Sequence, residues 1–244
     1  GSMPRKAPNL AKLSLEHLED RSVPSTWLYG DNLYIFSTES DDSVSVSNYW
    51  GNIWVYENGV ETSFSENAVS RINFFGYGGD DTFTAAPTDA VLSGNGFSNQ
   101  VLNFDEVKAY AFYGGYDQAF LTDSAGDDQF VATHFYALLN GANFYNFAKN
   151  FEFAQGHSQS GGNDEAKLYD SVGDDTLTFS SAYASMSRTG YENRALGFAQ
   201  TKAFANYGGN DTANFLEAKT GGTLRAKDSS SDLRRGAPRQ WAFD

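Results

Sequence analysis

The chain has 244 residues, enough for a sizeable core, with 24 glycines, no cysteine and a formal net charge of −14. The lack of cysteine excludes disulfides and thiol chemistry, and no apolar run is long enough to span a membrane. Residues 22–218 carry seven basic against 25 acidic side chains. That balance argues against nucleic-acid binding and favours either cations as ligands or simple solubility.

Residues 1–26 are expected to precede the folded part of the chain. Gly1 and Ser2 are typical of the remnant of a cleaved tag. The stretch LSLEHLEDRSVPS (13–25) resembles the amino-terminal segment of planctomycete extracellular proteins, roughly L-x-L-E-x-L-E-x-R-x-x-P-S. In that family the segment is associated with export and precedes Asp- and Gly-rich repeats. The resemblance implies an extracellular or cell-surface location and a repeat architecture, and it implies no activity.

Residues 27–78 show the alternation of apolar and polar residues that is typical of strands, for example in SVSVS and NIWVY. The sequence Glu57-Asn58-Gly59 between two such runs predicts a β-hairpin, because Asn-Gly accepts positive φ at both central positions. We predict that this region forms a β capping layer, since the end of a stacked β-fold exposes strand edges.

Residues 79–228 contain an internal repeat of 47 residues. The motif GDD begins at 79, 126 and 173, and GG-x-D begins at 114, 161 and 208. Apolar positions keep the same period, including Phe104, Phe151 and Phe198, as expected where each repeat buries its face on its neighbour. We therefore predict an all-β fold, a right-handed parallel β-helix (β-solenoid) with about two coils per repeat, in which these phenylalanines form one interior row. A β-sandwich is the alternative, and residues 229–244 are expected to form a basic tail.

Acidic residues recur in the glycine-rich turns of every repeat. One interpretation is structural, because Asp accepts hydrogen bonds from turn N–H groups. The other is a metal site, because Ca²⁺ prefers carboxylate and carbonyl oxygens and would relieve the repulsion between stacked acids. The motif is also similar to the G-G-x-G-x-D nonapeptide of calcium-binding β-rolls, from which it departs in its twelve-residue spacing. The candidate Ca²⁺ ligands are Asp117, Asp123, Asp127, Asp128, Asp164, Asp170, Asp174 and Asp175.

No residue pattern points to catalysis. His157 stands where the neighbouring repeats have Tyr110 and Phe204, which favours a packing role, and no nucleophile or zinc motif is present. We therefore expect a structural or adhesive module at the cell surface, not an enzyme, with a polysaccharide or other surface proteins as partners. The alternatives are a glycan-binding or polysaccharide-degrading β-helix and a scaffold without ligand. Exposed aromatics for glycan binding would be Trp50, Tyr116 and Tyr145.

Overall fold

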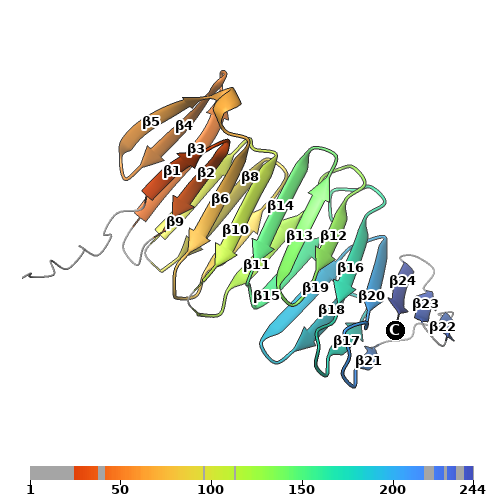
Figure 1. The fold of residues 1–244 in the computed structure, drawn as a ribbon. Helices are drawn as coiled ribbons and strands as arrows, with labels where there is room; N and C mark the ends of the chain where they lie inside the picture. Colours follow the sequence, from red (N-terminus) through yellow and green to blue (C-terminus); the bar gives the residue numbers. More distant parts are fainter. Residues whose placement is uncertain are drawn as a thin grey trace, which may run out of the picture.

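The computed structural model describes residues 25–37, 42–95, 97–112, 114–216, 223–227, 230–234 and 239–243. Within these ranges the chain is all-β, and its strands form two twelve-stranded sheets, here called sheet A and sheet B (Figure 1). A 3₁₀ turn, η1 (Glu66–Ala68), leads out of β5.

The strands of sheet A, in spatial order, are β1 (Ser25–Tyr29), β2 (Asn32–Phe36), β6 (Arg71–Gly76), β10 (Glu106–Ala111), β14 (Phe144–Lys149), β13 (Tyr136–Gly141), β12 (Gln129–Ala132), β16 (Glu165–Tyr169), β20 (Gln200–Phe204), β24 (Arg239–Phe243), β23 (Ser230–Arg234) and β22 (Thr223–Lys227). Those of sheet B are β21 (Thr212–Phe215), β17 (Thr176–Phe179), β18 (Tyr183–Arg188), β19 (Tyr191–Leu196), β15 (Phe153–His157), β11 (Gln118–Thr122), β7 (Thr82–Ala85), β8 (Asp89–Gly94), β9 (Phe97–Leu102), β3 (Asp42–Tyr49), β4 (Asn52–Glu57) and β5 (Val60–Ser65).

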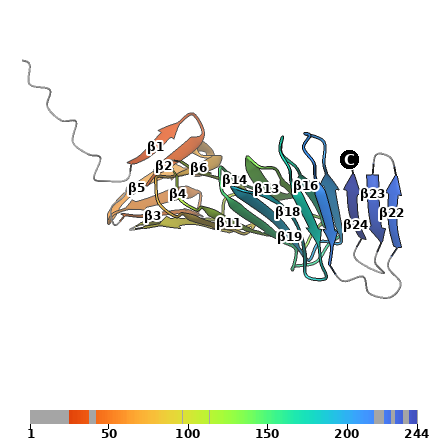
Figure 2. The ribbon, with the colours of Figure 1, turned by 90° about the horizontal axis from the view of Figure 1, so that it is seen from below.

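The chain winds between the two sheets, which run as layers along the molecule (Figure 2). Strands β6, β10 and β14 pair in parallel in sheet A, as β7, β11 and β15 do in sheet B. Each repeat also contains an antiparallel three-stranded meander, such as β12–β13–β14. The molecule is thus a β-solenoid, as the repeat predicted, with antiparallel meanders inserted into its parallel sheets.

Successive repeats place equivalent strands on opposite sheets. From β7 in sheet B, the chain visits sheet A at β10 and sheet B at β11, and it starts the next repeat at β12 in sheet A. One repeat therefore contains three crossings, or one and a half coils, where the sequence suggested about two. Residues related by one 47-residue period do not pair, and the parallel partners of Ala119 are instead Phe83 and Ala154.

The single interior row predicted for Phe104, Phe151 and Phe198 was wrong for the same reason. All three side chains are buried, but Phe104 and Phe198 follow strands of sheet B, whereas Phe151 follows a strand of sheet A. An odd number of crossings moves each repeat to the other edge of the solenoid. The Phe151 ring contacts Phe83, with ring centroids 6.2 Å apart, and the same contact recurs one period later between Phe198 and Phe130 at 5.8 Å.

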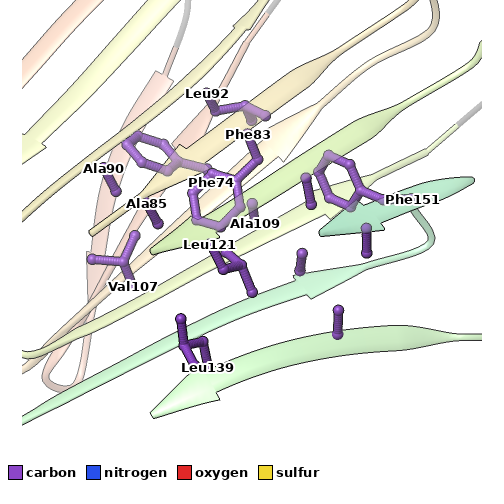
Figure 3. Packing of buried hydrophobic residues seen from close by; sticks show 14 of the residues in the cluster. Phe74, Phe83, Ala85, Ala90, Leu92, Val107, Ala109, Leu121, Leu139 and Phe151 are labelled. Carbon is purple, nitrogen blue, oxygen red and sulfur yellow. The ribbon is translucent and has the colours of Figure 1, made fainter. Parts of the chain in front are cut away.

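The core lies between the inner faces of the two sheets. In sheet A, Phe74 and Val107 point inward, and Phe83, Leu92 and Leu121 meet them from sheet B (Figure 3). Alternation along each strand separates these apolar side chains from an outward-facing set, because successive strand residues point to opposite faces. The outer faces of both sheets are therefore free to differ from one another.

The predicted capping layer, residues 27–78, is built into both sheets. Strand β2 pairs in parallel with β6, and β3 pairs in parallel with β9. The hairpin predicted at Asn58-Gly59 is confirmed, because β4 and β5 are antiparallel and these two residues have φ of 48° and 83°. At the other end, the region expected as a basic tail contains β23 and β24, which with β22 continue sheet A beside β20. Residues 1–24, which include most of the predicted export segment, lie outside the described residues.

Candidate metal centres at the acidic turns

The acidic residues lie in turns that carry the chain from one sheet to the other. Because neighbouring coils run in parallel, the turn that follows one coil stacks on the equivalent turn of the next. Asp80, Asp127 and Asp174 are exposed in these turns. Each uses its Oδ1 to accept a 2.8 Å hydrogen bond from a backbone N–H 36 residues further along the chain. These carboxylates hold neighbouring coils together.

The second acid of each GDD motif also bonds to the next coil, but here its backbone N–H is the donor and the next coil supplies the acceptor. The backbone N–H groups of Asp81, Asp128 and Asp175 donate to Oδ1 of the aspartate 36 residues later, at 2.8–2.9 Å. The glycine pair of the stacked turn makes this approach possible. At Gly162, φ is +93° and a Cβ would overlap the carbonyl oxygen of Gly126, so only glycine fits without strain.

The first group of acids joins the turn after β11 to the turn after β15. Asp123, Asp128 and Asp164 are all buried, and one oxygen of each lies within 4.8 Å of the others. Backbone N–H groups of 159 and 160 donate to the Asp123 carboxylate at 3.0–3.1 Å. Hydroxyls complete the set, because Ser124 donates to Asp128 and Ser158 donates to Asp164 at 2.6 Å. Every carboxylate oxygen of this group thus accepts a hydrogen bond.

The second group joins the turns after β16 and β20. It contains Asp170, Asp175 and Asp211, again with one oxygen of each within 4.8 Å of the others. Ser171 donates to Oδ2 of Asp175 through both its N–H and its hydroxyl, and the Tyr191 hydroxyl donates to Oδ1 at 2.6 Å. Asp170 is fully buried, and its Oδ1 has no hydrogen-bond partner. A buried carboxylate oxygen without a donor is costly unless a proton or a cation compensates it.

The electrostatics of both groups disfavour three bare charges. Burial, with the charges of Asp123 and Asp128 adding to it, raises the pKa of Asp164 above its usual range. Burial likewise raises the pKa of Asp170, and the charges of Asp211 and Asp175 act in the same direction. A divalent cation among these oxygens would reverse the effect, because it stabilises the ionised form. The all-oxygen donor set suits a hard cation such as Ca²⁺.

The first copy of the turn lacks the third acid. Gly76 stands where the later copies have Asp123 and Asp170, and a Cβ at Gly76 would overlap the Asp81 carboxylate. Asp81 is 1% exposed, and neither of its oxygens has a hydrogen-bond partner. Burial, and then the charge of Asp117, raises the pKa of Asp81 to about 7. The pKa of Asp117 rises to about 6, chiefly through burial.

The structure divides the eight predicted ligands into four sets. Asp123, Asp128 and Asp164 form the first group, and Asp170 and Asp175 belong to the second. Asp117 lies beside Asp81 without a third acid, whereas Asp127 and Asp174 face solvent and bind backbone N–H groups.

The predicted ligands did not include Asp211, whose own repeat has TGG (220–222) where the others have GDD. Its partner is in fact Asp175 of the preceding repeat. A usable signal was the motif D-S-x-G-D-D, which occurs at 123–128 and 170–175 and marks both groups. The first copy reads G-Y-G-G-D-D at 76–81 and lacks the leading Asp-Ser.

The residues considered for other functions lie away from the acidic groups. His157 ends β15 and pairs with Thr122 on the outer side of sheet B. Of the aromatics proposed for glycan contact, Trp50 is 94% exposed and Tyr116 is 50% exposed, while Tyr145 is half-buried beside Lys108. None of these residues belongs to either acidic group of the described chain.

Comparison of the chain with protein-family models, curated proteins and solved structures finds no match. Within the described ranges, no helix reaches the length and hydropathy that crossing a membrane requires.

Proposed function

We propose that the chain is an extracellular or cell-surface structural module whose buried acidic turns bind Ca²⁺ and whose outer surface serves adhesion. The β-solenoid supplies a rigid, elongated body, and the resemblance of residues 13–25 to planctomycete extracellular proteins supports the location. Stacked coils stabilise the fold without disulfides, which fits the absence of cysteine.

The observation that carries the calcium proposal is the unpartnered Oδ1 of Asp170, buried among Asp175 and Asp211. A cation would compensate this oxygen and the mutual repulsion of the three carboxylates together. The Asp123 group offers a second site of the same composition. Neither group shows a closed cage, so affinities in the range of extracellular sites, about 10⁻⁴–10⁻³ M, are expected.

The test is thermal unfolding of the full chain in EDTA and in about 10 mM CaCl₂, a concentration above the expected Kd, with NaCl matched for ionic strength. A site that binds only the folded chain adds RT ln(1 + [L]/Kd), about 1.4 kcal/mol at a tenfold excess of ligand over Kd. Asp170→Asn should reduce the calcium-dependent increase in Tm. Asp174→Asn is the matched control, because it removes one charge from the same turn but from outside the group.

The proposal fails if calcium raises Tm no more than the matched salt does. It also fails if Asp170→Asn keeps the whole calcium-dependent shift, or if Asp174→Asn loses as much of it. In the first case the acids are turn formers only and the chain is a scaffold without a metal ligand. In the other two cases calcium stabilises the chain, but not through the proposed Asp170 group.

A further inference from the structure

The outer faces of the two sheets carry different side chains at equivalent positions of the repeat. On sheet A, Phe75 pairs with Tyr110 across β6 and β10, and their rings stack with centroids 5.0 Å apart. Two periods later, Tyr169 and Phe204 make the same stacked pair across β16 and β20, at 4.7 Å. The intervening copy lies on sheet B and has Thr122 paired with His157.

The fold therefore does not need an aromatic pair at this position. The same strand pairing forms with Thr122 and His157, whose side chains lie on the outer side of sheet B. At this repeat position the aromatic pair occurs on sheet A and not on sheet B, although Phe120 and Phe153 pack together elsewhere on the outer side of sheet B. The difference between the two faces thus points to a partner that meets sheet A.

Charged residues are divided between the faces in the same way. Every lysine within the described part of residues 25–216 lies on an outward position of a sheet A strand: Lys108, Lys149, Lys167 and Lys202. Together with Arg71 they make five cations, which meet the carboxylates of Glu106, Glu165 and, in the turn before β2, Asp31, so this face has a charge of +2. In a chain with a net charge of −14, this face is set apart electrostatically.

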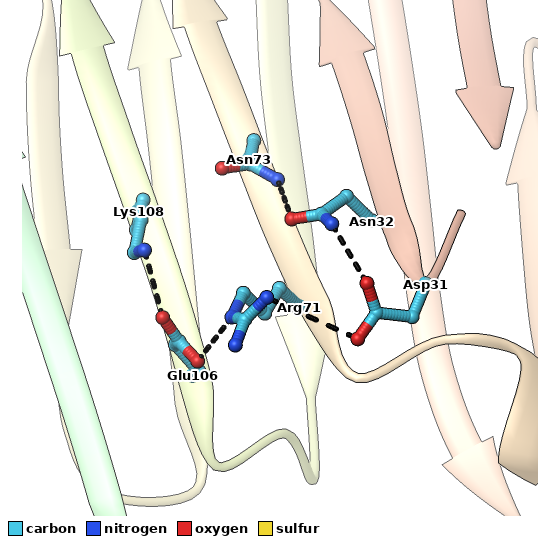
Figure 4. A network of polar contacts seen from close by, with 6 residues as sticks. All are labelled: Asp31, Asn32, Arg71, Asn73, Glu106 and Lys108. Atoms are coloured by element: carbon cyan, nitrogen blue, oxygen red, sulfur yellow. Dashed lines mark hydrogen bonds and ion pairs between the residues drawn. The ribbon is translucent and has the colours of Figure 1, made fainter. Parts of the chain in front are cut away.

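The cations form two groups, each beside one of the aromatic pairs. Glu106 binds Arg71 at 2.6 Å and Lys108 at 2.8 Å, in a network that continues through Asp31 and Asn32 to Asn73 (Figure 4). In the second group, Glu165 contacts both Lys167, at 3.1 Å, and Lys202. Each group holds two cations around one glutamate, which keeps their ammonium and guanidinium groups in place. Asp31 balances the charge of the first group through Arg71, and the second group keeps a net positive charge.

The aromatic surface is continuous over the first group. Ring contacts run from Tyr34 through Phe36, Phe75 and Tyr110 to Phe147, with centroids 4.7–6.4 Å apart. Phe112, 38% exposed, borders this row. Partly exposed rings beside fixed cations and hydrogen-bonding groups match a ligand with C–H surfaces, hydroxyls and negative charge.

We propose that the outer face of sheet A binds an anionic, carboxylate-bearing polysaccharide along the two cation–aromatic groups. The positive charge attracts the carboxylates, the rings contact the sugar C–H surfaces, and the Glu106 and Glu165 networks fix the donors. Two groups on one face give a long polymer two points of attachment. This inference deepens the adhesive role proposed above and does not depend on the calcium sites.

The test uses the full chain in EDTA at low salt, with polygalacturonate as the probe and its methyl-esterified form as the uncharged control polymer. EDTA separates this test from the calcium proposal, which can fail or hold independently. Binding is measured by affinity electrophoresis and by calorimetry. We expect polygalacturonate to bind and the esterified polymer to bind at least about tenfold more weakly, with affinity falling as salt screens the charges.

Two variants locate the surface. Lys108→Gln/Lys202→Gln should weaken binding about tenfold, because it removes one cation from each group. Arg188→Gln/Arg194→Gln, on strands of sheet B, makes the same change in net charge and should leave binding intact. Phe75→Thr/Tyr110→His installs the pair that sheet B already carries, and it should fold and lose binding.

The proposal is overturned if polygalacturonate does not bind, or if the esterified polymer binds as well. It is also overturned if the sheet B variant weakens binding as much as the sheet A variant. If the Phe75→Thr/Tyr110→His protein folds and keeps full affinity, the two rings do not take part in binding. That result would contradict the proposed surface.

Discussion

Replacing the buried carboxylate of Asp81 should stabilise the protein at neutral pH. The folded pKa of about 7 lies about 3 units above the ordinary value of about 3.9. The folded state therefore holds this proton more tightly than the unfolded chain, and stability is lost as pH rises from about 4 through 7. At 1.36 kcal/mol per unit the loss reaches about 4 kcal/mol, an upper value because relaxation around Asp81 reduces it.

The measurement is urea unfolding of the wild type and of Asp81→Asn, in EDTA, at pH 5 and at pH 8. The variant cannot ionise at residue 81, so its free energy of unfolding should exceed that of the wild type at pH 8 and approach it at pH 5. Asp80→Asn, an exposed neighbour in the same turn, controls for the change in net charge. Parallel pH profiles for wild type and Asp81→Asn would refute the reasoning, because the buried group would then not be the one that titrates.

Two further substitutions test the stacking of the coils. Phe151→Ala should lower the free energy of unfolding by about 3–5 kcal/mol, because it opens a cavity beside Phe83; a loss below about 1 kcal/mol would place the ring outside the core. Gly162→Ala should lower it by about 1–3 kcal/mol, because its φ is +93° and the new Cβ would overlap the Gly126 carbonyl. Gly126→Ala is the control, since its Cβ would make an ordinary contact at 3.5 Å with Ser124; equal effects of the two would contradict the close approach.

The sequence predicted the kind of fold but not how the repeat advances. The 47-residue period and the alternation of apolar residues depend on local pattern, and the Asn58-Gly59 hairpin depends on backbone preferences, so both could be recognised. The number of crossings depends on the meanders, in which the chain turns back before it leaves the sheet. Glycine-containing turns such as that at Gly190, with φ of +97°, mark these hairpins, but only pairing shows which sheet receives them.

The sequence predicted that aspartates in the turns form the acidic groups, but not which aspartates share a group. The reason is again that the path of the chain between the sheets is not visible in the sequence. From the sequence, candidate ligands were grouped by the turn in which they occur. In the structure, each group combines the first and last aspartates of one Asp-Ser-x-Gly-Asp-Asp turn with the aspartate that lies 36 residues after that turn's last aspartate. That offset follows from the length of a coil with its meander. Asp127 and Asp174 look identical in sequence to their neighbours Asp128 and Asp175, but alternation of the backbone turns their side chains outward to solvent.

The two acidic groups should differ in affinity for calcium, because they differ in how many of their carboxylate oxygens already accept a hydrogen bond. All six oxygens of the Asp123 group accept hydrogen bonds, so a cation there competes with N–H and hydroxyl groups for the same lone pairs. In the second group, Oδ1 of Asp170 has no donor to displace. Arg188 lies 3.1 Å from Ser171 and opposes a cation, but its exposed side chain is screened by water.

Calorimetric titration with calcium should therefore resolve a tighter and a weaker step, with the tighter one assigned to the Asp170 group. Asp170→Asn should remove the tighter step, and Asp123→Asn should remove the weaker step. If Asp123→Asn removes the tighter step, displacement of the existing donors does not limit binding. Because both groups contain three carboxylates, their burial rather than their hydrogen bonding would then set the affinity, since Asp211 of the second group is exposed.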